Sequence, residues 1–428
     1  MRSERSPAES LSTLIRPILN HVTHRLNHLS PFAPIALFLI VLILLTAARI
    51  APYGYRMSAL IGMEQQFIDL NPGATFEGLV VFKDSGYDGQ FFYLIARVLF
   101  DPSFFEPVLD TYRMRMGRIG MSLLVGLPAS LLGWQSYALI AFTILQLVHI
   151  LSFLSLRSML SEKNRYLALF FLFSPFSYNS SLLLVSDSLM VAVAVLGLAM
   201  LEKGGFRFST DGEDRTDYRS RWTIGATLLL CFLVTIRDTA LFALAPIVLL
   251  FLYRKSLRGV LLAALPVLVF LAWMAAVRLL ETHPGSNPVH YDAKLGGPMV
   301  GFFQSLNGEA FASIKGAARE MSKYLNLIYL LIMVSTFFYI RSLLAAALFS
   351  PLIFTAALSV FSVVEYWATF DNVNRMFTLS IPIMALLRDR IPNMRSHGLF
   401  LLSVVFLLLL AVRLVWLKPA MAFTTIGL

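Results

Sequence analysis

The segment from Lys83 to Gln90 combines residue types that could do chemistry. It runs Lys-Asp-Ser-Gly-Tyr-Asp-Gly-Gln, so that Asp84 and Asp88 stand four residues apart among glycines. Glycine permits tight turns that expose a neighbouring side chain, and a carboxylate held just above a bilayer can act as a general base on a hydroxyl group. The alternative interpretation is an ordinary solvated Asp-Gly turn, which the spacing alone does not exclude.

Three other polar positions interrupt apolar stretches or border them. They are Asp187, the pair Arg237-Asp238, and Arg375. Ionisable groups at the ends of membrane spans or within them are costly and usually functional, and an arginine fork matches phosphate oxygens bidentately. Each position also has a structural interpretation. Asp187 could cap a helix that begins at 188, Arg237-Asp238 could form a hairpin turn, and Arg375 could lie at the rim of a loop.

A second basic group and two histidines need separate treatment. Arg113, Arg115 and Arg118 could bind a lipid phosphate or anchor the chain among lipid headgroups. His283 and His290 lie seven residues apart in a Pro- and Gly-rich segment. A metal site would need further ligands, so we interpret these histidines as incidental.

The composition excludes a water-soluble protein. Of the 428 residues, 57% are hydrophobic and 14% are charged, whereas soluble domains carry about 25% charged residues. Runs without any charged residue cover 32–48, 135–156, 259–277 and 343–364. A membrane-spanning helix needs about 20 residues, with about 17 as the lower limit. Segments such as LIVLILLT do not alternate as barrel strands would.

We therefore expect an all-α, polytopic transmembrane bundle of about 10–12 spans, with a polar first outer loop that carries short interfacial helices. The apolar aromatic stretch 90–100 is too short to span and is the expected interfacial helix. The candidate spans are 32–48, 117–133, 135–156, 166–185, 188–201, 222–236, 239–252, 259–277, 324–340, 343–364, 376–387 and 398–415.

The spans form one expected domain, residues 32–418, between two tails. Residues 1–31 form a basic tail that we expect in the cytoplasm, and residues 419–428 form a short C-terminal tail. The run 32–48 exceeds the 7–15 residues typical of a cleaved signal, which favours an uncleaved anchor. The expected outer loops are 49–116 and 281–322.

The loop charges predict an orientation, because Lys and Arg collect on the cytoplasmic side. Loops 157–165, 253–258 and 388–395 are basic, and 202–221 is mixed but favours the same side. One crossing is left undecided by this rule. Loop 49–116 is expected outside and loop 157–165 inside, so the chain between them must cross the membrane an odd number of times, but two candidate spans lie there. Either 117–133 is re-entrant, or part of 87–105 enters the membrane, or one loop departs from the rule.

The charge balance does not indicate nucleic acid binding. The net charge is +10, but the positive-inside rule accounts for the basic residues in the short loops. The single cysteine, Cys231, excludes an intramolecular disulfide. The sequence has no Walker A loop, no GxGxxG and no HExxH, which disfavours a soluble nucleotide-sugar enzyme.

The order of these motifs resembles that of bacterial membrane glycosyltransferases with the GT-C architecture, and more loosely that of the GPI mannosyltransferases. The resemblance rests on SGYDGQFFYLIA (85–96) followed by YRMRMGRIGMSLLVGLP (112–128). Further along, SPFSYNSSLLLVSDSLMVAVAVLGLAML (174–201), Arg237-Asp238-Thr239, and Asn374-Arg375 before FTLSIPIMALL continue it. It runs over about residues 32–390, and Tyr87-Asp88-Gly89-Gln90 is its most specific part.

The resemblance implies an inverting glycosyltransferase in the bacterial cytoplasmic (inner) membrane. Such an enzyme moves a hexosyl or pentosyl unit from a polyprenyl-phosphate donor to a cell-surface polysaccharide or lipid-linked acceptor on the outer face. The implied catalytic residues are Asp88 and, as second candidate, Asp84, although the adjacent acidic pair of many relatives is missing here. The implied substrate-binding residues are Gln90, Tyr87, Asp187, Arg237, Arg375 and Arg113. The resemblance makes no cofactor certain, and a divalent cation, Mg²⁺ or Mn²⁺, is the one candidate.

Two other classes of function stay open on the sequence. The first is a transporter or flippase for a lipid-linked glycan, and the second is a non-catalytic scaffold in glycopolymer export. The chain shows no internal inverted repeat and few polar residues deep within its spans, which disfavours a transporter. The role of Asp88 separates an enzyme from a scaffold, because only an enzyme needs its carboxylate.

Overall fold

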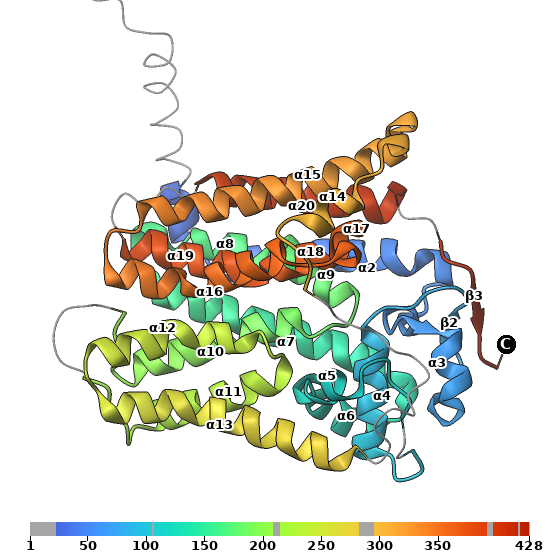
Figure 1. The fold of residues 1–428 in the computed structure, drawn as a ribbon, viewed down its shortest axis with the longest axis horizontal. Coiled ribbons are helices and arrows are strands. Elements are labelled where there is room, and N and C mark those ends of the chain that lie inside the picture. The colour runs from blue at the N-terminus through green and yellow to red at the C-terminus, as the bar shows by residue number, and fades with distance from the viewer. Residues whose placement is uncertain are drawn as a thin grey trace, which may run out of the picture.

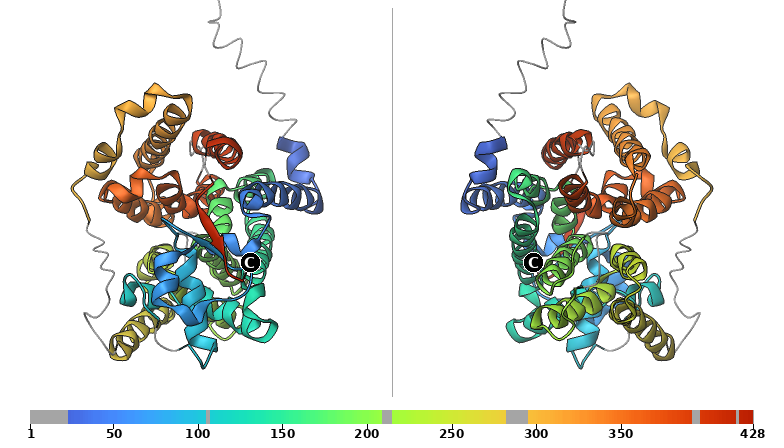
Figure 2. Two further views of the ribbon diagram at one scale, coloured as in Figure 1. Left: turned by 90° about the vertical axis from the view of Figure 1, so that its right-hand side faces the viewer. Right: turned by 90° about the vertical axis from the view of Figure 1, so that its left-hand side faces the viewer.

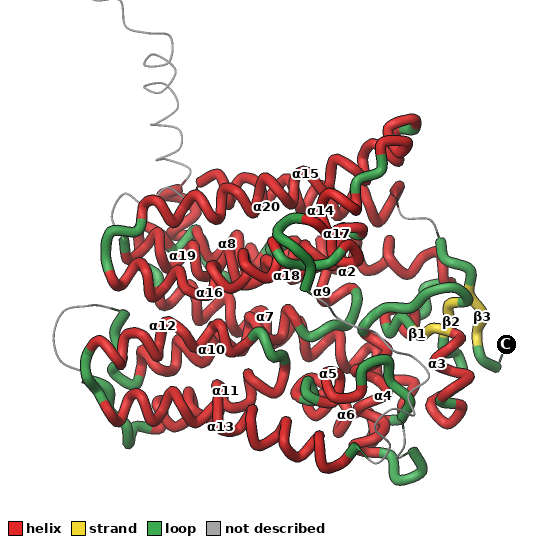
Figure 3. The backbone as a smooth tube through the Cα atoms, in the orientation of Figure 1, coloured by secondary structure: helices red, strands yellow, loops and turns green. Residues whose placement is uncertain are grey.

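Long helices lie side by side along one direction in the computed structural model of the chain (Figures 1 and 3). The structure describes residues 23–104, 107–208, 215–281, 295–391, 397–417 and 420–427, so His283 and His290 lie outside the described residues. The expected all-α polytopic bundle is confirmed, since 76% of the described residues are helical. The molecule is therefore a multi-pass membrane protein by the length and composition of its helices.

Among the described residues, six helices are long and apolar enough to cross a membrane, counting the short turns that extend some of them. They are α2 (Phe32–Ile50), α7 (Tyr137–Met159), α13 (Leu257–Leu280), α15 (Ile314–Ser335), α16 (Leu343–Val360) and α20 (His397–Val412). Leucines at helical spacing on α13, such as Leu261, Leu265 and Leu268, are exposed. Such an apolar outer face suits contact with lipid chains rather than water.

Shorter helices complete the bundle and its loops. They are α3 (Gln65–Leu70), α4 (Gly89–Phe100), α5 (Tyr112–Met116), α6 (Gly120–Leu132), α8 (Leu167–Leu172), α9 (Pro175–Leu182), α10 (Asp187–Lys203), α11 (Arg221–Ile236), α12 (Ala240–Tyr253), α14 (Val300–Ser305), α17 (Val364–Ala368), α18 (Phe370–Met376) and α19 (Ser380–Arg390). The 3₁₀ turns are η1 (Ala51–Tyr53), η2 (Met57–Leu60), η3 (Pro72–Ala74), η4 (Trp134–Ser136), η5 (Glu162–Asn164), η6 (Gly308–Ala312), η7 (Thr336–Tyr339) and η8 (Phe377–Leu379).

Two predicted spans are interrupted helices. The span predicted at 166–185 consists of α8 and α9, because Pro175 has no N–H to continue the first helix and Ser174 caps the second through the N–H of Ser177. The predicted bounds 376–387 are too narrow for the second, because α18, η8 and α19 run consecutively from Phe370 to Arg390. Interrupted helices leave backbone groups for polar contacts at membrane depth.

The basic loops predicted to share one side of the membrane do gather at one end of the bundle. The Asn27 side chain donates to the Lys163 carbonyl (2.8 Å), and the Asn164 side chain donates to Asp389 (2.9 Å). The Arg390 guanidinium donates to the Met159 carbonyl in the same region (2.9 Å). We call this the far end. Figure 2 views the bundle from its two ends.

The opposite end carries a small three-stranded sheet, and we call it the sheet end. Strand β1 (Met63–Glu64) pairs in parallel with β2 (Val80–Phe82), and β2 pairs antiparallel with β3 (Phe423–Thr425). The expected C-terminal tail therefore contains a strand that lies against the first loop (Figure 1). The Lys83 N–H donates to the Ala422 carbonyl (3.0 Å), so β3 holds the chain where the Asp84–Asp88 segment begins.

We expect a variant that ends at Ala420 to lose this restraint. The amides of Gly78 and Lys83 donate to carbonyls of the C-terminal segment, so both should exchange with solvent faster without it. Hydrogen–deuterium exchange read by mass spectrometry measures this, with peptides from α10 as the internal control. Unchanged exchange over 78–83 would contradict the described pairing.

The undecided crossing concerns α6, whose 13 residues are fewer than a span needs. Its first residue, Gly120, packs against Ile236 at the end of α11, and Trp134, just after it, lies under the Arg97 guanidinium of α4 (4.9 Å from the ring centroid). These contacts at both ends of α6 favour α7 as the helix that makes the crossing. Helix α4 lies across the long helices (Figure 1). Its first nine residues are buried, so the expected interfacial helix is a packed one.

Candidate functional site

Four of the predicted site residues meet at the sheet end although they are far apart in the sequence. The Arg375 guanidinium lies 3.2 Å from one carboxylate oxygen of Asp88 and 3.9 Å from Asp187. Asp187 also pairs with Arg237 at 2.5 Å. The four residues come from the start of α4, the start of α10, the end of α11 and the last turn of α18. The fold therefore assembles one charged cluster from separate segments.

Further ion pairs extend this cluster towards α5 and α12. Arg115 bridges Asp88 (3.1 Å) and Asp110 (2.7 Å), and Arg118 pairs with Asp238 (3.0 Å). We refer to the eight residues together as the charged cluster. They are Asp88, Asp110, Arg115, Arg118, Asp187, Arg237, Asp238 and Arg375. Its four carboxylates and four guanidinium groups balance in charge.

The position of Asp88 is fixed by its neighbours in the sequence. Gly89 lies so close to the carbonyls of Ile61 and Leu183 that a Cβ there would stand 2.7 Å and 2.5 Å from them. The side-chain oxygen Oε1 of Gln90 accepts from the Glu64 N–H (3.0 Å), and the Tyr87 hydroxyl donates to the Ala59 carbonyl. These contacts pack the Asp-Gly-Gln segment against β1 and the end of α9.

Asp187 is placed by the tight reversal between α9 and α10. Leu184 adopts a left-handed conformation there, with φ of 45°, which is a strained choice for a branched residue. The Ser180 hydroxyl stabilises the reversal by accepting from the Ser188 N–H (2.9 Å). Ser186 makes no side-chain cap hydrogen bond. The Asp187 carboxylate is 2% exposed and forms an ion pair with Arg237. Asp187 is therefore more than a helix cap.

Arg375 is held in a set orientation by its own helix. Its Nε donates to the Asp371 carbonyl (3.2 Å), and its terminal nitrogen donates to the Asn372 side chain (2.8 Å). The Arg375 side chain is 8% exposed, so Arg375 is not an exposed residue at the rim of a loop. The amide of the adjacent Asn374 is fully buried without a hydrogen-bond partner among the described residues. Such groups usually contact water or a ligand.

The arginines control the protonation state of Asp88. Partial burial alone would raise the pKa of this carboxyl, but the charges of Arg115 and Arg375, with Arg118 and Arg237 further away, hold the pKa well below its usual range. Asp88 is therefore ionised at neutral pH, as a general base must be before it accepts a proton. The same arginines weaken it as a base because they stabilise the anion.

Other predicted residues lie outside the charged cluster. Asp84 is exposed at the tip of its loop, and Arg113 forms a surface pair with Glu281 (2.5 Å). Gln90 and Tyr87 are next to the cluster, but the contacts described above bind them to the backbone. Within the basic group 113–118, the side chains of Arg115 on α5 and of Arg118 just after it point into the charged cluster. The side chain of Arg113 points to the surface.

The sequence analysis missed one carboxylate and undervalued another. Asp110 orients Arg115 through two hydrogen bonds, of 2.8 and 2.7 Å, yet in sequence it is one of many acidic residues in a polar loop. Asp238 was regarded as part of a turn with Arg237, and it pairs instead with Arg118 of another segment. The useful signal was the spacing Asp110 to Arg115, which a five-residue turn can close.

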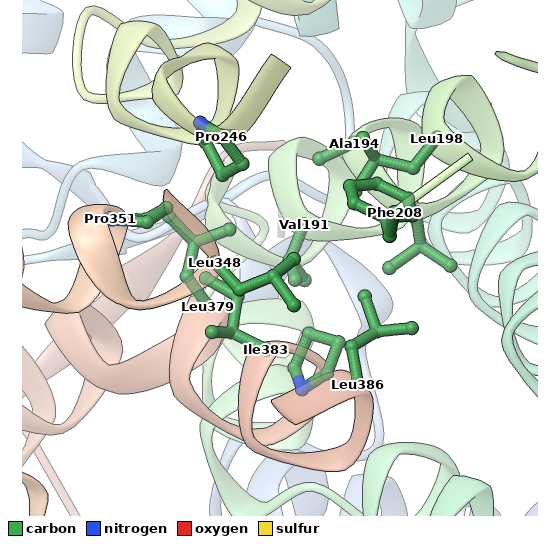
Figure 4. Close-up of a pocket in the computed structure, with 13 residues that line it drawn as sticks. Val191, Ala194, Leu198, Phe208, Pro246, Leu348, Pro351, Leu379, Ile383 and Leu386 are labelled. Atoms are coloured by element: carbon green, nitrogen blue, oxygen red, sulfur yellow. The ribbon is translucent and has the colours of Figure 1, made fainter. Parts of the chain in front are cut away.

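An apolar cavity begins one helical turn from Asp187 and follows α10 away from the charged cluster. The empty space within it, counted together with the open solvent at its mouth, is about 410 Å³. The lining residues come from α10, α12, α16, η8 and α19 together with Phe208. Figure 4 shows Val191, Leu198, Pro246, Pro351 and Ile383 turned towards one another in this cavity. A site with charged groups at one end and aliphatic walls along the other suits an amphiphile with an anionic head.

The charged cluster does not fit a divalent cation. Each of its carboxylates lies beside a guanidinium group, whose positive charge opposes a metal ion. Within the described ranges, no group of three or more His, Cys, Asp or Glu side chains could hold a metal ion. The chemistry below is therefore derived from the side chains alone.

Comparison with known proteins adds no assignment. No family model matches the chain, and no curated protein matches it. The geometry of the charged cluster and of the apolar cavity beside it therefore carries the functional argument.

Proposed function

We propose that the protein is an inverting glycosyltransferase that moves a sugar from a polyprenyl-phosphate donor to a glycan or lipid-linked acceptor. The observation that carries the proposal is the convergence of Asp88, Asp187, Arg237 and Arg375 beside an apolar cavity. An ionised carboxylate can take a proton, guanidinium groups can hold a phosphate, and an aliphatic cavity can hold a prenyl chain. A transporter does not require a base at this position.

The proposed reaction is one displacement. The acceptor hydroxyl oxygen attacks the anomeric carbon of the sugar, while the bond from that carbon to the phosphate oxygen breaks and its electron pair leaves with the phosphate. Asp88 takes the hydroxyl proton. The products are a glycoside of inverted configuration and a polyprenyl phosphate with one more negative charge. Guanidinium groups aimed at that growing charge stabilise the transition state.

Arg375 is the best placed ligand for the phosphate, with Arg237 beside it. Both contact Asp187, which is almost completely buried. Asp187 keeps the two guanidinium groups close together and offsets their repulsion, so we assign it a positioning role. Arg115 contacts Asp88 from the other side.

Donor binding also activates the base in this proposal. In the free protein, Arg375 donates to Asp88 (3.2 Å). A donor phosphate competes for the same guanidinium group, and the pKa of Asp88 rises towards its usual value when the guanidinium turns from the carboxylate to the phosphate. The carboxylate then becomes a stronger base when donor is bound.

The prenyl chain enters the apolar cavity. From Asp187 to Leu198 the rise along α10 is about 16 Å, which is close to the hydrocarbon thickness of one leaflet, about 15 Å. The lining side chains of α12, α16 and α19 offer no hydrogen-bonding group to the chain. The donor thus lies with its phosphate at the charged cluster and its tail along α10.

We place the protein in the bacterial cytoplasmic membrane, with the N-terminal tail in the cytoplasm and the sheet end outside. A cysteine introduced at the exposed Ser85 should then react with a membrane-impermeant thiol reagent in intact spheroplasts. Cys231, within α11, should react only after the membrane is disrupted, and it serves as the control. Labelling of position 85 that also needs membrane disruption would reverse the orientation.

A transfer assay tests the proposed activity. Purified protein is incubated with a panel of polyprenyl phosphates, each carrying a different radiolabelled sugar, and with membrane lipids and glycans as acceptors. We expect label in an acceptor from at least one polyprenyl-phosphate donor and none from the matching nucleotide sugars. Label taken from nucleotide sugars alone would refute the proposed donor class.

A further inference from the structure

A second cavity, which is polar, lies beside the charged cluster and shares no lining residue with the apolar cavity. The empty space within it, counted together with the open solvent at its mouth, is about 230 Å³. The lining residues are Arg49, Asn179, Leu182, Leu183, Asp371, Leu410, Arg413 and Leu414. They come from the ends of α2, α9, α18 and α20, whereas the apolar cavity lies among α10, α12, α16 and α19. We call it the arginine cavity.

Two guanidinium groups face a single carboxylate among the described residues that line the arginine cavity. Arg413 forms a bidentate pair with Asp371, and one of its two contacts measures 2.6 Å. Arg49 lies over the Tyr87 ring (5.1 Å from the centroid) and is attracted by the charge of Asp371. Arg49 is only 6% exposed. The excess of one positive charge at a buried site favours an anion.

The backbone at Arg413 departs from regular helix. Residues Arg413–Leu417 form a single π-helical turn, η9, at the end of α20. Such turns are rare, and they often occur at functional sites. Leu410 and Leu414 continue the cavity wall along α20, and Leu182 and Leu183 line it from α9. The cavity therefore offers charge at one side and aliphatic walls at the other, as the headgroup region of a lipid requires.

We infer that the arginine cavity binds the phosphate headgroup of the acceptor, and that the acceptor is an anionic lipid. This inference rests on the proposed function and extends it from the donor to the acceptor. In the free protein the Asp371 carboxylate takes the place at the Arg413 fork that a phosphate would take. The bound lipid displaces it.

The position of the arginine cavity relative to Asp88 indicates that the bound lipid is the acceptor, rather than a lipid that takes no part in the reaction. Arg49 stacks on Tyr87, which directly precedes Asp88. Asp371 accepts at its carbonyl from Arg375, one helical turn later. A lipid phosphate at Arg49 and Arg413 thus brings the hydroxyl groups of its headgroup towards the carboxylate that would take the proton. Donor and acceptor reach the charged cluster through separate cavities.

Binding of a short-chain phosphatidic acid to the purified protein in a neutral detergent tests the inference. We expect Arg49→Gln and Arg413→Gln to weaken its binding by about 10- to 100-fold, since each removes hydrogen bonds between charged groups. Asp371→Asn should tighten binding, because it removes the competing carboxylate. This increase in affinity keeps the test decisive even where a Gln variant folds poorly. Arg113→Gln is the matched control, because Arg113 is an exposed arginine near the same end.

Two further probes decide the chemistry of the ligand. Inorganic phosphate should bind much more weakly than phosphatidic acid, and short-chain phosphatidylcholine should not compete. Equal binding of phosphate and phosphatidic acid would refute a lipid site, and competition by phosphatidylcholine would refute the selection of an anion. If only Arg375→Gln weakens the binding of phosphatidic acid, and the Arg49 and Arg413 variants do not, the arginine cavity is not the binding site. In each of these outcomes, sugar transfer in the assay above would still support the proposed function.

Discussion

Asp88→Asn should lower sugar transfer by about 100- to 10,000-fold, the usual cost of losing a general base, while the protein still folds. The substitution keeps the shape of the side chain. Arg115 and Arg375 donate to different oxygens of the carboxylate, so the amide oxygen can still accept a hydrogen bond from one of them. The amide cannot take the acceptor proton. Initial rates at saturating donor measure the effect, together with size-exclusion profiles in detergent.

Asp84→Asn is the matched control for this prediction. Asp84 lies in the same loop, four residues earlier, and is exposed. Its variant should transfer sugar at nearly the wild-type rate. A well-folded Asp88→Asn protein with undiminished product would remove the catalytic assignment and favour a scaffold or a transporter. Removing one partner of a buried charge pair can also destabilise a protein, so rates are compared only between preparations with the same folded fraction.

Arg375→Lys should raise the apparent KM for the donor by about 10- to 100-fold, which corresponds to the loss of hydrogen bonds between charged groups. Lysine keeps the charge but has no planar fork. It cannot hold a phosphate bidentately while also contacting Asn372, as Arg375 does. Transfer rates over a series of donor concentrations separate this effect from a loss of kcat.

Arg113→Lys makes the same chemical change at a surface arginine paired with Glu281, and it should leave the donor KM unchanged. If Arg375→Lys and Arg375→Ala both match the wild type, the donor phosphate binds elsewhere, and Arg237 or Arg115 becomes the candidate. A fall in kcat without a change in KM would place Arg375 at the leaving group only in the transition state.

The class of the fold was predictable because lipid leaves few choices for the backbone. Long uncharged runs identified α2, α7, α13 and α16, since a helix satisfies its own backbone groups. Helix α6 was harder. Its residues are as apolar as those of a span, and the tertiary contacts of Gly120 and Trp134 favour α7 as the helix that makes the crossing.

The charged cluster was predictable in its members but not in its connections. Asp187 and Arg237 were recognisable because charge in an apolar run is costly, and a sequence does not show that the two form a pair 2.5 Å apart. Arg113 and Arg115 are alike in sequence. Only the direction of each side chain on α5 separates the surface pair with Glu281 from the bridge between Asp88 and Asp110.

The arginine cavity was not foreseen, for a related reason. Arg49 lies in the last turn of a long apolar helix and Arg413 lies near the end of another, so both had the appearance of ordinary residues at the membrane surface. Their burial against Asp371 depends on the packing of α2, α18 and α20. A pattern that is local in sequence cannot contain it.

The most direct test of the account is the fate of a doubly labelled donor in proteoliposomes that contain only this protein and an anionic acceptor lipid. One label is on the sugar and the other on the prenyl chain. A glycosyltransferase yields glycosylated acceptor and free polyprenyl phosphate in equal amounts, and Asp88→Asn forms both about 100- to 10,000-fold more slowly. Transfer of both labels together to the other leaflet, with the sugar still attached to the prenyl phosphate, would contradict the account and identify a flippase.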